Sequence, residues 1–140
     1  MKRTLLIIAL LVCSLPLACQ KSEKAEASNE ASIAGTITVT KDLSEHVAPS
    51  SILFIIARKE VGPPLAVQRI ANPQFPLAYA LTQQDAMIPG TVMQGEIFVK
   101  ARLDRDGNAG PLETGDLTGQ LKRSAPVGSS DVNVTIDTLH

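Results

Sequence analysis

The 140-residue sequence has very few aromatic side chains and very few thiols. It contains no Trp, one Tyr, three Phe and two Cys. So few rings leave little surface on which sugars or single-stranded nucleic acids could stack. Thirteen basic residues against 14 acidic ones give a formal charge of −1, which offers no basic surface to a nucleic acid. We therefore expect a core of aliphatic side chains and no nucleic-acid partner.

The first 18 residues follow the order of a secretion signal. Two basic residues precede an apolar run at 4–12, and LPLAC at 15–19 places a small residue before a cysteine. The run is too short to span a bilayer, which needs roughly 20 apolar residues. The segment resembles a bacterial lipobox, in which the cysteine is acylated; a plain secretory signal is the alternative. We expect removal of residues 1–18 and anchoring of the chain in a lipid bilayer through acylated Cys19.

Residues 19–32 predict a lipidated, flexible tether. After the cysteine this stretch holds only charged, polar and small side chains, which cannot bury enough apolar surface to fold. Gln20, rather than Asp, follows the cysteine, which favours the outer membrane over the inner membrane. We expect a periplasm-facing protein with one folded domain at residues 33–140. Because Cys13 leaves with the signal and Cys19 carries lipid, that domain has no free thiol.

From residue 33 onward the sequence alternates apolar and polar side chains, which is typical of β-strands. Residues 51–58 are apolar on both alternating sets, which predicts a strand at the centre of the core. Prolines at 73 and 76 place the start of the strand at 75–81 on a sheet edge. The seven strands expected in this way cover residues 33–40, 51–58, 65–70, 75–81, 97–103, 120–127 and 132–137.

The connections between these segments are short and rich in Gly and Pro. Asp42 followed by Glu45 predicts one short helical turn capped at Asp42, ending before Pro49. Asp106-Gly107 predicts a tight turn. About seven short strands with almost no helix predict an all-β fold, an immunoglobulin-like antiparallel β-sandwich. A β-barrel has similar patterning and is the alternative.

Seven segments follow one another in the order and spacing of a known domain. They are GTITV at 35–39, VAP at 47–49, LFIIAR at 53–58, GPPLAV at 62–67, FPL at 75–77, DAMIP at 85–89 and GDLTG at 115–119. In these segments the sequence resembles the C-terminal domain of cytochrome c-type biogenesis protein H. The resemblance covers nearly all of residues 33–137.

This resemblance implies an immunoglobulin-type sandwich that binds protein and catalyses nothing. In that family, the protein helps to present apocytochrome c to the haem-ligation machinery, so apocytochrome c and haem-ligation proteins are the implied partners. The family protein has transmembrane segments and a tetratricopeptide helical region before this domain. Here the lipobox-like segment and the tether stand in their place, and residues 120–123 look like an insertion.

Two long loops, at residues 82–95 and 108–119, are the expected binding surface, since loops on a rigid sandwich often carry recognition. Asp85, Met87 and Asp116 lie in these loops and are the candidate binding-loop residues. For each aspartate the structural alternative is a hydrogen bond to turn backbone. For Met87 it is packing of a loop onto the sandwich.

No residue pattern predicts catalysis or a resident metal. His46 is the only histidine before the terminal His140, and no serine lies in a Gly-x-Ser-x-Gly motif, so we do not expect an enzyme. DRDGN at 104–108 begins like a calcium loop but lacks the later Gly and Glu, and a turn accounts for it. Copper bound by both histidines with Met87 and Met93 is the alternative, as in a carrier or accessory protein of a periplasmic redox pathway. We predict no cofactor and no metal site.

We predict that Cys19→Ala abolishes incorporation of radiolabelled palmitate and moves the protein from the membrane fraction to the soluble fraction. Alanine has no sulfur on which the lipid can be assembled, and removal of the acyl chains removes the bilayer anchor. Cys13→Ala is the matched control, and it should keep both the label and the membrane fractionation. A wild-type chain that takes up no palmitate would contradict lipidation.

Overall fold

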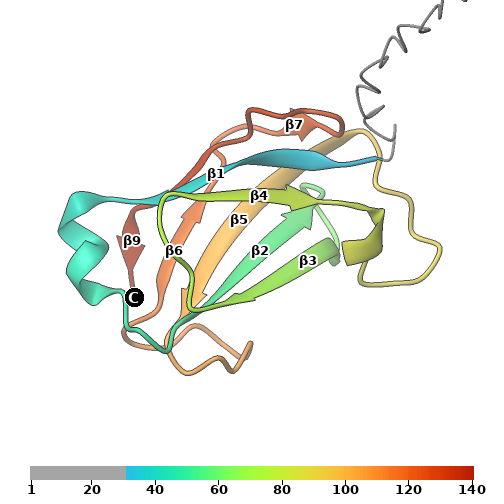
Figure 1. Ribbon diagram of the computed structural model, residues 1–140. Helices are drawn as coiled ribbons and strands as arrows, with labels where there is room; N and C mark the ends of the chain where they lie inside the picture. The colour runs from blue at the N-terminus through green and yellow to red at the C-terminus, as the bar shows by residue number, and fades with distance from the viewer. Residues whose placement is uncertain (1–30) are drawn as a thin grey trace, which may run out of the picture.

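Nine β-strands and two short 3-10 helices make up the part of the chain that the structure, a computed structural model, describes, residues 31–140 (Figure 1). The strands form two sheets, of three and six strands. The expected all-β sandwich of immunoglobulin-like type is confirmed. The predicted signal peptide, Cys19 and nearly all of the tether lie outside the described residues.

The smaller sheet is built around the first strand. Its order is β4–β1–β8, formed by Leu77–Leu81, Ile33–Val39 and Val134–Ile136. β1 is antiparallel to β4 and parallel to β8. The predicted edge position of the fourth strand is confirmed, since β4 ends this sheet.

The larger sheet has the order β3–β2–β5–β6–β9, and the short strand β7 pairs with the start of β5. β2 lies between β3 and β5, in agreement with its predicted central position. Its core-facing side chains are fully buried, whereas Ile52 and Ile56 on its other face are half-buried. The strands are β2 (Ile52–Arg58), β3 (Pro64–Ala71), β5 (Glu96–Asp104), β6 (Leu117–Gln120), β7 (Ala125–Pro126) and β9 (Thr138–Leu139).

The core lies between the two sheets and is mainly aliphatic, as the composition predicts. Successive strand residues point to opposite faces, so alternate side chains of β5 are buried. Tyr79 is the one ring in the cluster of buried side chains between the described parts of the two sheets, while the buried ring of Phe54 lies outside this cluster. Burial raises the pKa of the Tyr79 hydroxyl, which donates a hydrogen bond of 2.7 Å to the Val132 carbonyl. Besides Tyr79, the largest contributors are Ile33, Ile37, Leu53, Ile55, Leu81, Met93, Ile97, Val99, Leu103, Leu117, Val134 and Ile136.

Three details differ from the sequence-based expectations. The strand expected at 120–127 begins at Leu117, because Leu117 pairs with Leu103 of β5, and within 121–127 only β7 is extended. The first 3-10 helix, η1 (Lys41–His46), has Thr40 and not Asp42 at its N-cap position, and the Thr40 side chain makes no capping hydrogen bond. Nine strands replace about seven, since β7 and β9 are two-residue pairings that leave no periodicity in a sequence.

Two glycines let the C-terminal segment lie close to both sheets. At Gly35 on β1, a Cβ atom would lie 2.1 Å from the Val132 carbonyl oxygen, and at Gly119 on β6 it would lie 2.0 Å from the Thr135 carbonyl oxygen. Side chains at these positions would displace the backbone that leads into and forms β8. The absence of both side chains therefore allows β8 to lie against β1 and β6 and to close the sandwich.

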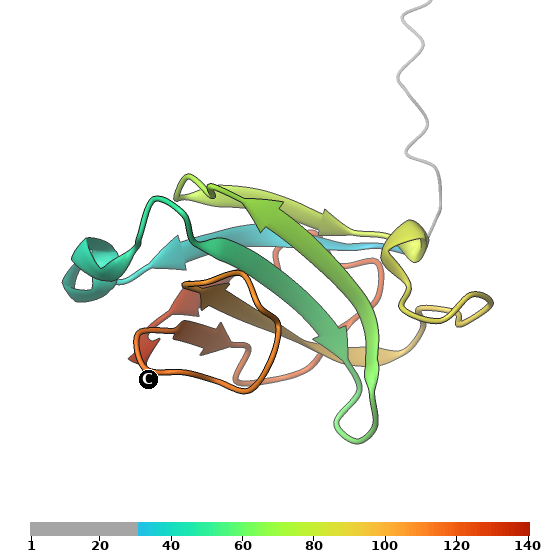
Figure 2. The same ribbon diagram turned by 90° about the horizontal axis from the view of Figure 1, so that it is seen from below.

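The sandwich has two distinct ends. β1 begins at the N-terminal end, which also carries the loop at residues 86–95 (Figures 1 and 2). At the far end lie η1, the β3–β4 connection at 72–76 and the loop at 105–116. A seven-residue strand separates the ends by about 20 Å. Within residues 31–140, no helix has the length and apolar character needed to cross a membrane.

We predict that Gly119→Ala destabilises the domain by about 3 kcal/mol, because the added methyl group overlaps buried backbone that has no room to move. Urea unfolding followed by far-UV circular dichroism measures the change. Gly110→Ala is the matched control, since its Cβ would approach no atom closer than 3.6 Å; it should stay within about 0.5 kcal/mol. Equal stability of the two variants would contradict the close approach at β6.

Candidate functional site

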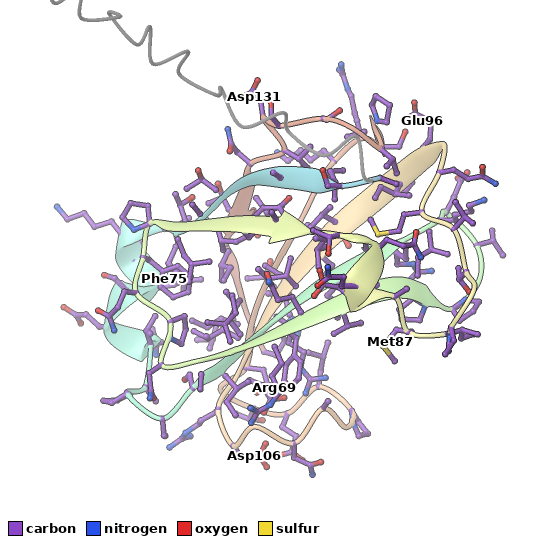
Figure 3. All side chains as sticks on the ribbon, turned by 45° about the vertical axis from the view of Figure 1, so that its right-hand side comes forward. Arg69, Phe75, Met87, Glu96, Asp106 and Asp131 are labelled. Atoms are coloured by element: carbon purple, nitrogen blue, oxygen red, sulfur yellow. The ribbon has the colours of Figure 1, made fainter. Side chains whose placement is uncertain are left out.

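A cleft of about 590 Å³, here called the end cleft, opens at the far end of the sandwich. It lies between the end of β1, the segment from η1 to Pro49 and the β3–β4 connection. Figure 3 places Phe75 of this connection at the end of the molecule opposite to Met87. The lining residues are Thr38, Val39, Ser44, Val47, Ala48, Pro49, Asn72, Pro73, Gln74, Phe75 and Pro76.

The walls of the end cleft are shaped by residues that interrupt regular structure. Pro49 follows η1, and Pro73 and Pro76 flank the start of β4, where a missing N–H prevents sheet pairing. Asn72 has a positive φ of 50°, a conformation that asparagine tolerates better than most residues. Phe75 and Val47 are half-buried and pack against the main core. The walls of the cleft are therefore held in place by the fold of the domain.

The lining of the end cleft is apolar with a few uncharged hydrogen-bonding groups. None of its eleven lining residues is charged; Thr38 and Ser44 supply hydroxyl groups, and Asn72 and Gln74 supply amide groups. Its volume lies within the range of about 300–1,000 Å³ typical of ligand pockets. An anionic ligand would find no cation among these lining residues. The chemistry suits an uncharged, largely apolar chain segment whose amides need a few partners.

Beside this cleft, a buried ionic cluster holds the loop at 105–116. Arg102 of β5 is only 9% exposed and points away from the sandwich core. Its Nη2 lies 2.9 Å from Asp116 Oδ2 and 2.6 Å from Asp104 Oδ2. Arg102 also donates hydrogen bonds to the carbonyl oxygens of Gly110 (2.6 Å) and Pro111 (3.0 Å). One guanidinium thus ties two strands and the intervening loop together.

The two carboxylates of this cluster also hold backbone N–H groups. Asp116 accepts from the N–H groups of Arg105 (3.2 Å) and Glu113 (3.0 Å), and Asp104 accepts from Gly107 at 2.7 Å. Burial raises the pKa of Asp104 above its ordinary value. The pKa of the exposed Asp106 carboxyl is lowered, mainly by a hydrogen bond from Asn108 N–H. The predicted turn at Gly107 is confirmed, with a φ of 77°.

A second hollow of about 360 Å³ adjoins the end cleft. It lies between η1 and the loop at 105–116, and its polar lining includes His46 and Arg105. The same residues, Val47, Ala48 and Pro49, border both hollows. The ionic cluster therefore fixes the loop that forms one wall of the far end.

The structure separates the three candidate binding-loop residues. Asp85 accepts from Thr82 N–H at 2.8 Å and closes the capping box of the 3-10 helix η2 (Gln83–Asp85). Asp116 is buried in the ionic cluster, as described. Met87 lies at the N-terminal end with 57% of its surface exposed. The carboxylates of Asp85 and Asp116 therefore both accept hydrogen bonds from groups within the domain. A binding role for any of the three residues stays a prediction.

The residues imagined as a copper site do not come together. His46 and His140 lie at the far end, where His140 Nε2 is 2.8 Å from Thr118 Oγ1. Met87 is at the other end and Met93 is buried in the core. Within residues 31–140, no three His, Cys, Asp or Glu side chains group closely enough to hold a metal ion.

The sequence analysis did not identify the end cleft. Its lining comes from the end of β1, from the segment between η1 and Pro49, and from the β3–β4 connection at 72–76, which lies more than 20 residues further along the chain. The available signal was the clustering of prolines with hydrophobic residues, in VAP at 47–49 and NPQFP at 72–76. Two of the segments that carry the family resemblance, 47–49 and 75–77, meet at this cleft.

Comparison with known proteins gives one family. Residues 33–137 match the family described as cytochrome c-type biogenesis protein H Ig-like domain. A protein of Aquifex aeolicus, described only as uncharacterized, is 29% identical over 109 residues, covering 76% of this chain and 71% of its own length. The cytochrome c-type biogenesis protein CycH of Pseudomonas aeruginosa is 34% identical over 110 residues, covering 73% of this chain. The match spans 26% of the length of CycH.

Among solved structures, an alternative pilotin from the type II secretion system of Vibrio cholerae matches with a TM-score of 0.48 and 16% sequence identity. This match covers 78% of this chain and 96% of the pilotin chain.

We predict that Arg102→Met destabilises the domain by about 3–5 kcal/mol, because it leaves Asp104 and Asp116 buried without a cation. Arg69→Met is the matched control. Arg69 is exposed on the same sheet face, separated from Arg102 by Phe54 in the strand register, and its loss should cost at most about 0.5 kcal/mol. Thermal unfolding of both variants measures the difference, and similar midpoints would show that the cluster does not support the fold.

Proposed function

The chain belongs to the cytochrome c-type biogenesis protein H Ig-like domain family, and on this basis we propose that it is a non-catalytic protein-binding module in c-type cytochrome biogenesis. In this proposal Cys19 carries the lipid that anchors the chain, and the domain faces the periplasm from the outer membrane. The family relationship supports the link to cytochrome c biogenesis. The signal-like segment and the lipobox-like cysteine support the anchor.

The end cleft is the observation that carries the binding role. It is apolar, uncharged and of ligand-pocket size, and it lies at the end of the sandwich away from the N-terminus of the domain. A domain tethered at its N-terminal end would present such a cleft toward the periplasm. Exposed polypeptide segments with small or apolar side chains fit this lining, with backbone amides bonded to Asn72 and Gln74.

Apocytochrome c is the partner that these features favour. A cytochrome without its haem exposes apolar segments that the finished protein buries, and such segments match an apolar cleft. Haem itself is a poorer fit, because its propionates would find no cation among the lining residues. A haem-ligation protein that offers an exposed apolar segment would satisfy the same chemistry. The copper-carrier alternative receives no support from the separated histidines and methionines.

We predict that the mature lipoprotein in detergent binds haem-free cytochrome c and that Ala48→Trp weakens this binding at least tenfold. The indole ring would occupy the end cleft that Ala48 lines. Ala80→Trp is the matched control, since Ala80 is exposed on β4 and is not among the cleft residues. Isothermal titration calorimetry measures each dissociation constant, and thermal unfolding verifies that each variant is folded.

A second variant, Gln74→Arg, tests the same cleft from an exposed position by placing a charge in its uncharged lining. Weaker binding by both cleft variants, with unchanged binding by Ala80→Trp, supports the proposal. Equal affinities of Ala48→Trp, Gln74→Arg and Ala80→Trp would show that the binding surface lies outside the end cleft. No binding by the wild-type lipoprotein would reject apocytochrome c as the partner.

A further inference from the structure

Large apolar side chains are exposed to solvent at the N-terminal end of the sandwich. The loop at residues 86–95, here called the apolar loop, presents Met87, Ile88 and Val92, which are 57%, 56% and 59% exposed. Val61, in the connection between β2 and β3, is 85% exposed, and this connection adjoins the loop, because Met87 N–H is bonded to the Leu65 carbonyl near the start of β3. Clustered exposed apolar side chains of this kind mark interaction sites more often than isolated ones do.

The apolar loop is held in place by its own hydrogen bonds. Met87 N–H donates to the Leu65 carbonyl at 2.9 Å, and Met93 N–H donates to Gln83 Oε1 at 3.0 Å, while the Met93 side chain is buried in the core. Between these fixed points, Thr91 N–H donates to the Ile88 carbonyl at 3.0 Å, closing a turn. The fold thus directs the exposed side chains outward and prevents them from collapsing onto the core.

Backbone hydrogen bonds join the apolar loop to the start of the domain. Val127 N–H donates to the Gly95 carbonyl at 3.0 Å, and the next residue, Gly128, donates to the Ser32 carbonyl at 2.6 Å. Gly95, the last residue of the loop, is therefore connected to Ser32, the residue before β1, through the adjacent residues Val127 and Gly128. An anchor on the N-terminal segment would therefore also keep the apolar loop close to the anchoring surface.

We propose that the apolar loop inserts into the surface of the lipid bilayer that carries the anchor. This inference rests on the proposed lipidation of Cys19. The thirteen residues from 20 to 32 span only about 20 Å if they behave as a random coil, so this end of the sandwich stays near the bilayer. The far end lies about 20 Å from this end along β1.

The composition of the apolar loop suits a bilayer surface. Its sequence, AMIPGTVMQG, contains no charged residue, so no charge must be desolvated when it enters the headgroup region. Its three exposed side chains can reach the apolar boundary while the backbone of the turn stays at the level of the headgroups. Loop insertion together with the lipid gives two attachment points. The domain is then oriented with the end cleft facing away from the membrane.

The absence of tryptophan from the sequence makes the test direct, because a single introduced Trp is the only one in the protein. The full mature lipoprotein carrying Val92→Trp is reconstituted into vesicles of phosphatidylethanolamine and phosphatidylglycerol at three to one. Brominated acyl chains in the same vesicles quench fluorescence from a ring at the bilayer surface. Leu112→Trp, in the far-end loop, is the matched control, since Leu112 is also exposed (42%).

We expect brominated lipid to quench Val92→Trp at least twofold more than Leu112→Trp, and Met87→Trp to behave like Val92→Trp. Equal quenching at both ends, or none at either, in protein that floats with the vesicles overturns the loop insertion and leaves the anchor intact. Protein that does not float overturns both the anchor and the inference. If the emission wavelength of Val92→Trp changes with protein concentration and bromine does not quench it, the loop contacts a second copy of the protein. This result also overturns the loop insertion.

Discussion

The fold depends on the close approach of the C-terminal segment to the two sheets at Gly35 and Gly119. Backbone that enters a core must have its polar groups paired. Here Val132 N–H donates to the Ala34 carbonyl at 2.9 Å and the Val132 carbonyl accepts from Tyr79, so the buried segment is satisfied. β8 therefore joins β1 and contacts β6, and this contact holds together the sheets whose ends carry the apolar loop and the end cleft.

The far end depends on a second interaction, the buried guanidinium of Arg102. Two carboxylates and two loop carbonyl oxygens surround it, and they fix a twelve-residue connection between β5 and β6 that has no regular structure of its own. A buried ion pair contributes more to a unique conformation than to net stability in some proteins. In this domain the conformation that it selects forms the wall of the hollow beside the end cleft.

The two ends of the sandwich carry different proposed functions, membrane contact at the N-terminal end and polypeptide binding at the far end. Apolar side chains exposed next to the start of the domain suit a bilayer, whereas an uncharged cleft about 20 Å away suits a polypeptide. A lipid alone would leave a tethered domain free to rotate. Contact of a rigid loop with the same bilayer would hold the cleft toward the periplasm, where a partner can reach it.

The fold class, most strands and the aliphatic core could be predicted from the sequence, because the side chains of a strand alternate between its faces and the period of two is visible in segments such as 97–103. The family also followed from the sequence, since seven segments matched in order. The folded domain was needed to establish the start of β6 at Leu117, the pairing of β7 and β9, the ionic cluster and the end cleft. Each of these depends on residues far apart in the chain, such as Arg102 with Asp116 or Val47 with Phe75, and no local pattern records which distant segments will meet.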